Sequence, residues 1–200
     1  MSYLDRVLAD GTDREAWEQA RWSVIGASDA AKLSKLESIE SYLASKLRRD
    51  GFDGNAYTAS GHRWEPMMLA WAGIPQSQAL IHSPDEPGFA ATPDGILQLA
   101  SGALRMAECK AKHGVIVNGP TLGEWRQVTW QFRCLPEAES IEWVWAEILN
   151  DDIRGGEPKH ITIPRNHPKV RELLPRIEPI ATELLARLRI ALEAERQLAS

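Results

Sequence analysis

Cysteine is scarce in this sequence, which contains only Cys109 and Cys134. They form no set of spaced pairs, so we expect no disulfide framework and a reducing compartment. The first residues lack the basic start and long apolar core of a signal peptide, and no apolar run approaches membrane-spanning length. We therefore expect a cytoplasmic protein that makes no membrane contact.

The motifs of several common enzyme classes are also missing. There is no Gly-Lys dipeptide and hence no Walker A loop, no Gly-x-Ser-x-Gly turn and no glycine-rich dinucleotide fingerprint. The five histidines show no close paired spacing for zinc, and two cysteines cannot build a four-cysteine iron–sulfur cluster. These chemistries are set aside.

Positive charge is not in excess. The 23 Lys and Arg residues are outnumbered by 28 Asp and Glu residues, which gives a formal net charge of −5. The chain therefore lacks the excess positive charge that favours nonspecific binding to nucleic acid. Any contact with DNA must come from a local group of basic residues. Basic residues gather at 46–50 and 110–113, although the first group also suits the solvated face of a helix.

The composition is sufficient for one buried core. The chain has 200 residues, 44% of them hydrophobic, and contains no Gly/Ser linker or low-complexity tract. We predict a single domain over 1–200, with N-terminal helices at 12–73, a sheet core at 79–164 and a C-terminal helix at 166–197. This order predicts an α/β fold with a central mixed β-sheet flanked by helices.

Capping residues suggest where the early helices begin. Thr12 followed by Glu15 has the pattern of a capping box, and Ser28 stands where the next helix would have its N-cap. Pro66 directly follows Glu65 in an apolar helical pattern, so that helix is predicted to begin near Glu65 or to kink there. Other helices are expected at 39–49 and 120–135, and strands at 79–82, 88–91, 95–99, 103–110, 141–149 and 160–164.

Two of these strands, 95–99 and 103–110, are joined at Ser101-Gly102, which predicts a β-hairpin. Asp94 lies in a Pro-Asp-Gly turn just before the first strand, and Glu108 lies near the end of the second. The hairpin therefore brings the two carboxylates toward the same end. The turn sequence alone is also explained by its conformational preferences, in which case Asp94 is only a turn residue.

Side chains alternate along a strand, so Glu108 and Lys110 share one face and Cys109 points to the other. Mg²⁺ prefers oxygen ligands and is usually held by a few carboxylates together with substrate phosphate. Asp94 and Glu108 supply such ligands, and the backbone carbonyl of Cys109 could supply a third. Lys110 would orient an attacking water and offset developing charge. The Asp…Glu-x-Lys spacing also occurs by chance.

Five further positions fit a phosphate-processing site. Glu65 is either a first-turn acid interacting with the helix dipole or a third metal-binding carboxylate. Ser28 is either a plain cap or, with Arg21 at the other end of the short connector, part of a phosphate pocket. Gln127 and Gln131 are four apart and share one helix face.

The segments WEQARWSVIGASD, GHRWE, TPDGI, ECK and WRQVTWQ occur in this order between residues 17 and 131. In order and spacing they resemble the lambda-exonuclease or YqaJ-type viral recombinase family of the PD-(D/E)xK nuclease superfamily. The resemblance covers roughly residues 15–150. It implies a restriction-endonuclease-like core and a Mg²⁺-dependent exonuclease that digests linear duplex DNA 5′→3′, leaving 3′ single strands for phage-type recombination.

The resemblance also implies roles for individual residues. Its metal ligands match Asp94, Glu108 and Glu65, holding one or two Mg²⁺ ions for which Mn²⁺ could substitute, and its Glu-x-Lys lysine matches Lys110. Its 5′-phosphate ligands match Arg21 and Ser28, and a further hydroxyl that can reach phosphate is that of Thr92.

One departure concerns the glutamines, since the family often has Gln-Val-Gln where this chain has Gln-Val-Thr. Gln127 is our choice for the active-site glutamine and Gln131 the alternative. The implied partners are double-stranded DNA ends and a single-strand annealing protein. The resemblance also implies that copies of the chain form a trimeric ring. The expected location is the cytoplasm of a bacterial or phage-infected cell.

Two rival functions remain open at the level of the sequence. A Mg²⁺-dependent endonuclease could use the same fold, although it would have no use for an end-phosphate pocket. A non-catalytic module that binds DNA ends would have little reason to keep the repulsive carboxylates.

Overall fold

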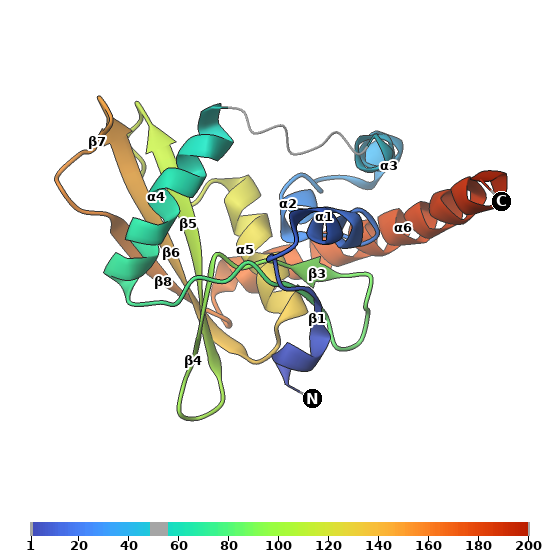
Figure 1. Ribbon diagram of the computed structural model, residues 1–200, viewed down its shortest axis with the longest axis horizontal. Helices are drawn as coiled ribbons and strands as arrows, with labels where there is room; N and C mark the ends of the chain where they lie inside the picture. The colour runs from blue at the N-terminus through green and yellow to red at the C-terminus, as the bar shows by residue number, and fades with distance from the viewer. Residues whose placement is uncertain (1, 49–55, 200) are drawn as a thin grey trace.

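The computed structural model describes residues 2–48 and 56–199 and is α/β throughout (Figure 1). The helices are α1 (Arg14–Trp22), α2 (Ala27–Ala30), α3 (Ile39–Leu47), α4 (Ala56–Ala72), α5 (Leu122–Cys134) and α6 (Pro168–Ala199), with 3-10 turns η1 (Tyr3–Arg6) and η2 (Leu36–Ser38). The strands are β1 (Val7–Ala9), β2 (Leu80–His82), β3 (Ala90–Ala91), β4 (Gly95–Gln98), β5 (Leu104–His113), β6 (Ala138–Leu149), β7 (Asp152–Ile153) and β8 (Lys159–Pro164).

The larger sheet has five strands in the order β4-β5-β6-β7, with β8 also paired to β6. The β5–β6 pair is parallel and the others are antiparallel, so the sheet is mixed as predicted. A parallel pair needs a long crossover, and α5 supplies it between the two central strands. This crossover lays α5 along the strand that carries Glu108 and Lys110.

A smaller sheet of order β1-β2-β3 leads into the hairpin. Ile25, just before α2, forms a parallel bridge with Phe89, so the N-terminal helices are attached to this sheet. The chain leaves β3 and turns through Asp94 into β4. The small sheet thus brings the N-terminal helices and the hairpin to a common edge.

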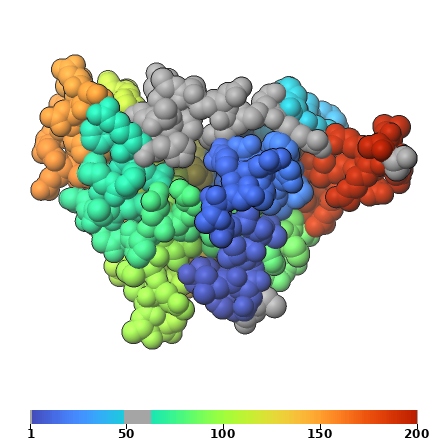
Figure 2. All heavy atoms as spheres, viewed as in Figure 1, coloured from blue at the N-terminus to red at the C-terminus, as the bar shows by residue number. Residues whose placement is uncertain are grey.

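Helices cover both faces of the larger sheet (Figure 1). Side chains of α5 and α6, such as Trp130 and Leu184, form the main core with Trp143 of β6. On the opposite face, Met68 of α4 packs in a second cluster with Cys109 of β5. Figure 2 shows α4 (teal) and the N-terminal segment (blue) exposed on the same side of the molecule.

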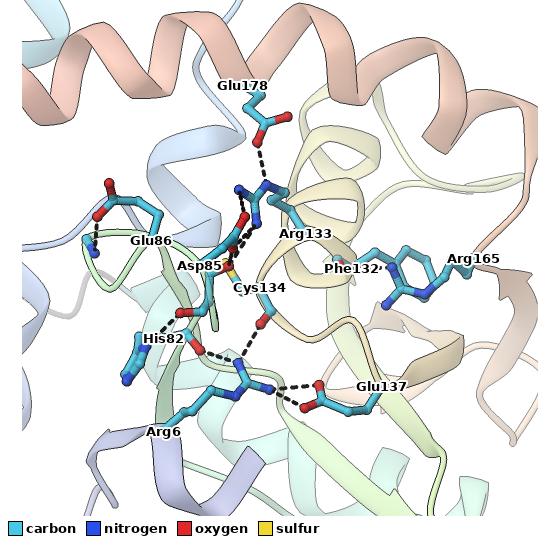
Figure 3. A network of polar contacts seen from close by, with 12 residues as sticks. Arg6, His82, Asp85, Glu86, Phe132, Arg133, Cys134, Glu137, Arg165 and Glu178 are labelled. Atoms are coloured by element: carbon cyan, nitrogen blue, oxygen red, sulfur yellow. Dashed lines mark hydrogen bonds and ion pairs between the residues drawn. The ribbon is translucent and has the colours of Figure 1, made fainter. Parts of the chain in front are cut away.

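Two arginines, of which Arg6 is buried and Arg133 half-buried, tie the ends of these elements together (Figure 3). Arg6 donates through Nη2 to both carboxylate oxygens of Glu137 at 2.7 Å and through Nη1 to the Cys134 carbonyl at 2.8 Å. Arg133, at the end of α5, bonds Asp85 at 2.8 and 2.9 Å and Glu178 of α6 at 2.5 Å. These contacts fix α5 relative to both sheets and to α6.

Two predicted N-caps are wrong. Asp13, not Thr12, caps α1 by accepting from the Ala16 N–H, while the Thr12 amide and hydroxyl both donate to Asp10. Adjacent Thr and Asp are both good caps, and the local turn at Asp10 engages the threonine.

Gly26, not Ser28, is the N-cap of α2, so Ser28 lies inside the first turn. Helix α4 continues through Pro66 instead of beginning near Glu65. Short strands β1 and β7 were not predicted. The helix expected at 39–49 is present as α3, while Arg49 and the end of the basic group at 46–50 lie outside the described residues.

Among the described residues, no helix is long and apolar enough to cross a membrane.

Candidate active site

The predicted hairpin is present and positions Asp94 against β5. Strands β4 and β5 pair antiparallel, from Gly95 opposite Ala107 onward. The Asp94 N–H donates to the Ala107 carbonyl at 3.1 Å, and Asp94 Oδ2 accepts from the Cys109 N–H at 2.6 Å. The aspartate is therefore held by the main chain at the point where the carboxylate of Glu108 leaves the strand.

Glu108 lies at the centre of a polar cluster between β5 and α5. It is only 1% exposed. Its Oε1 accepts from Lys110 Nζ and Gln127 Nε2, and its Oε2 accepts from Gln131 Nε2. The two glutamines considered as alternatives in the sequence thus both contact the same carboxylate, because one turn of α5 separates them.

The charges in this cluster perturb one another. Burial, followed by the nearby carboxylates of Glu108 and Glu65, raises the pKa of Asp94 well above its ordinary value. Burial opposes the charged form of Lys110, but the carboxylates of Glu108 and Asp94 outweigh it and raise the pKa of Lys110. These carboxylates therefore favour the charged ammonium form of Lys110.

Cys109 presents its side chain to the opposite face, as the strand alternation predicts. Its thiol packs in the apolar cluster with Met68 and Leu69 of α4, and burial raises its pKa. The N–H and C=O of a residue in an extended strand point to the same side. Because the Cys109 N–H is bonded to Asp94, its carbonyl is expected on the same side.

A cavity of about 400 Å³ opens beside this cluster. It is bounded by acidic, amide and hydroxyl groups from the hairpin, α4 and α5, and by the N-terminal helices. The predicted site residues on its wall are Arg21, Ser28, Glu65, Thr92, Asp94 and Gln127. Glu65 Oε1 also accepts from Gln76 Nε2 at 3.0 Å. Gln127 connects this wall to Glu108 by a hydrogen bond, and Lys110 and Gln131 donate to the same carboxylate.

The basic part of the cavity wall comes from α1 and α2. Arg21 Nη2 donates to Ser28 Oγ at 2.5 Å, so the two predicted phosphate ligands are in direct contact. The Thr92 hydroxyl is buried without a hydrogen-bond partner among the described residues. A guanidinium and two hydroxyls that line one cavity suit a phosphate group.

Sequence reasoning missed two residues on this wall. Trp17 lies under two guanidinium groups, with Arg14 at 5.0 Å and Arg21 at 5.4 Å from its ring centroid, and both Trp17 and Arg14 line the cavity. The signal was present, because Trp17 and Arg21 are four apart in a helix and therefore share a face.

The donor set fits a hard divalent cation. Among the described residues, no three His, Cys, Asp or Glu side chains form a ready-made metal cage. Mg²⁺ does not need one, since it keeps several waters and is commonly held by one or two carboxylates plus substrate phosphates. Burial and the carboxylates of Glu108 and Glu65 raise the pKa of Asp94, and a bound cation would oppose this effect by favouring the carboxylate form.

The structure as a whole has the fold of a known nuclease. An alkaline exonuclease from Laribacter hongkongensis, LHK-Exo, superposes with a TM-score of 0.64 and 21% identity over 92% of this chain and 97% of that chain. The complex of LHK-Exo with dAMP gives a TM-score of 0.62 and 19% identity over 92% of this chain and 99% of that one. No family model and no curated protein matches the sequence.

Proposed function

We propose that this chain is a metal-dependent DNA exonuclease of the lambda-exonuclease type, in the PD-(D/E)xK superfamily, that degrades linear duplex DNA from a 5′ end. The observation that carries the proposal is one cavity with two chemically different walls. Asp94 and Glu65 lie on the acidic side, and Arg21 and Ser28 lie on the basic side. The fold shared with an alkaline exonuclease supports the same class of reaction.

The acidic side suits phosphodiester hydrolysis. Asp94, Glu108, Glu65 and the Cys109 carbonyl would hold one or two Mg²⁺ ions, with Mn²⁺ as a substitute. A bound divalent ion supplies Lewis acidity and lowers the pKa of a coordinated water. The Lys110 ammonium would offset negative charge that develops on the phosphate, and Gln127 and Gln131 would hold the Glu108 carboxylate in a fixed orientation.

The basic side suits a terminal phosphate. Arg21 offers a guanidinium and Ser28 a hydroxyl, and Thr92 offers a second hydroxyl in the same cavity. A 5′ phosphate seated there would place the end of the duplex beside the carboxylates. This second anchor distinguishes an exonuclease from an endonuclease on the same fold, which would have to accept an uninterrupted strand.

A time course of digestion tests the proposal. Linear duplex labelled at either end and a closed circle would be incubated with Mg²⁺ or with EDTA. Loss of label from 5′ ends, only with Mg²⁺ and with the circle intact, is the expected result. Nicking of the circle would replace the proposal with the endonuclease, and cleavage of neither substrate would favour a non-catalytic module that binds DNA ends.

The end-phosphate pocket has its own test. Wild type should digest 5′-phosphorylated ends much faster than 5′-hydroxyl ends, whereas Arg21→Ala should show little difference between them. Equal wild-type rates on both ends would remove the assignment of Arg21 and Ser28. A trimeric ring and a single-strand annealing partner remain predictions from the family resemblance, and a cytoplasmic location remains a prediction from the cysteine content and the N-terminal sequence.

A further inference from the structure

Lys46 of α3 makes an unusual pair of contacts behind the basic wall of the cavity. Its ammonium donates to Asp29 Oδ2 at 2.7 Å and to the main-chain carbonyl of Arg21 at 3.0 Å. The lysine side chain is only 7% exposed. A long, charged side chain is thus buried against the segment that carries the predicted phosphate ligands.

The two acceptors lie at the two ends of that segment. Arg21 is in the last turn of α1, where carbonyl groups lack intrahelical partners and a cation is favoured. Asp29 is in the first turn of α2, where the same Oδ2 also accepts from the Gly26 N–H at 2.8 Å. One ammonium therefore joins the end of the helix that bears Arg21 to the start of the helix that bears Ser28.

Lys46 is separate from the large cavity. It lines a small cavity of about 30 Å³ with residues that include Asp29, Lys32 and Leu184 of α6. Helix α3 is itself attached to α6 through an ion pair between Glu40 and Arg187. Lys46 thus connects residues 21–29, which carry the two predicted phosphate ligands, to α3 and through it to α6. It does so without lining the cavity that would receive DNA.

Burying the charged end of Lys46 costs free energy, so a contribution to stability alone does not explain the contact. Burial lowers the pKa of Lys46 despite the attraction of Asp29, and the nearby Arg21 charge lowers it further. Replacing a buried ion pair by apolar groups is often neutral or stabilising, so stability alone does not account for such a pair. Fixing the relative placement of Arg21 and Ser28 does account for it.

We infer that Lys46 is a positioning residue for the recognition of a terminal phosphate, holding the Arg21 guanidinium and the Ser28 hydroxyl in the arrangement that binds the anion. The inference rests on the proposed function, because it assumes that Arg21 and Ser28 bind an end phosphate. It adds a residue from α3, which the sequence motifs do not include.

Equilibrium binding without hydrolysis tests the inference. Short duplexes with a 5′ phosphate or a 5′ hydroxyl would be titrated in EDTA against wild type, Lys46→Met, Lys46→Arg and Lys32→Met. Lys46→Met should reduce affinity for the phosphorylated end by about tenfold and leave affinity for the hydroxyl end unchanged. Lys46→Arg should recover part of the preference, because a guanidinium can also bond a carboxylate and a carbonyl.

Lys32→Met is the matched control, since it removes the same charge from the same small cavity and should keep the full preference. An unaltered preference in Lys46→Met would overturn the inference, as would an equal loss on both duplexes. If Lys46→Met fails to fold, Asp29→Asn provides the second test, because it removes the ionic partner but keeps an oxygen acceptor for the Gly26 N–H. Asp29→Asn should then reduce the phosphate preference, and an unchanged preference would overturn the inference.

The binding titrations of wild type and Lys46→Met distinguish a failure of this inference from a failure of the proposed function. A wild type that binds both ends equally would overturn the phosphate pocket and with it the role of Lys46, while Mg²⁺-dependent hydrolysis would still stand or fall in its own assay. A wild-type preference that survives in Lys46→Met would overturn only the role of Lys46.

Discussion

The Cys109 N–H donates a 2.6 Å hydrogen bond to Oδ2 of Asp94. This bond connects the turn before β4 to the strand that carries Glu108, at the point where the ladder between β4 and β5 has ended. The main chain of Cys109 therefore faces the candidate site while its thiol lies in the apolar cluster under α4. We therefore expect Cys109 to serve the candidate site through its backbone.

This division predicts that the thiol is dispensable for activity. Cys109→Ala should keep hydrolysis within a few fold of wild type and lower the free energy of unfolding by about 1 kcal/mol through loss of packing. The rate on linear duplex and a denaturant titration measure the two quantities. A loss of hydrolysis as large as that of a carboxylate variant, in a folded protein, would mean that the thiol itself takes part.

Lys110 should affect catalysis without affecting binding. Its ammonium contacts Glu108, and removing it in Lys110→Met should slow hydrolysis about 10²-fold or more, because a preorganised charge is lost from the site. Affinity for duplex in EDTA should change little. Lys112→Met is the matched control, since Lys112 lies on the same strand face but pairs with Glu124. Near-normal hydrolysis by Lys110→Met would contradict its assigned role.

The two glutamines of α5 should differ in what they support. Both bond Glu108, but Gln127 lines the cavity whereas Gln131 is fully buried. Gln127→Ala should lower kcat with little change in Tm. Gln131→Ala should lower kcat and also reduce stability by about 1–3 kcal/mol, because it leaves a buried carboxylate oxygen without its partner. Thermal melts and steady-state kinetics on both variants check this, and a Gln131→Ala melt equal to wild type would contradict it.

The arginine network of Figure 3 predicts a pH dependence of stability. Hydrogen bonds from Arg133 and then Ser83 hold the pKa of Asp85 well below its usual value of 3.8. A carboxyl with a depressed folded-state pKa contributes stability above its unfolded-state pKa, and this contribution is lost as the pH falls toward the folded value. Asp85→Asn should therefore lower Tm clearly at pH 7 and by less at about pH 3.5.

Thermal melts of wild type and Asp85→Asn at the two pH values measure this difference. Glu157→Gln, at an exposed position, serves as the control and should change Tm little at either pH. A Tm difference for Asp85→Asn that grows as the pH falls would show that the carboxylate is not stabilised in this way.

The sequence predicted the parts of the site that depend on local pattern. The hairpin followed from two apolar segments and a turn, and strand alternation then placed Glu108 and Lys110 on one face. The helical spacing of Gln127 and Gln131 put both on one side of α5, but only the packing of α5 against β5 showed that both reach the same carboxylate.

What the sequence missed depends on competition or on tertiary contact. Thr12 and Asp13 are both suitable caps, and the hydrogen bonds from Thr12 to Asp10 leave the cap to Asp13. Helix α4 keeps Pro66 inside it because its apolar side chains pack on the sheet. The contact of Lys46 with Asp29 and the Arg21 carbonyl joins residues from separate helices, so no local pattern indicates it.

The central claim is that the cluster around Glu108 hydrolyses DNA with a divalent metal. The most direct measurement is the release of mononucleotides from a linear duplex as Mg²⁺ is titrated into metal-free wild type, Glu108→Gln and Glu147→Gln. Glu147 is a matched control, because it is also buried and paired with a lysine but lies on β6 outside the cavity. Wild type and Glu147→Gln should respond alike to Mg²⁺, and Glu108→Gln should be slower by about 10²-fold or more. Release without metal, or near-normal release by Glu108→Gln, would contradict the account.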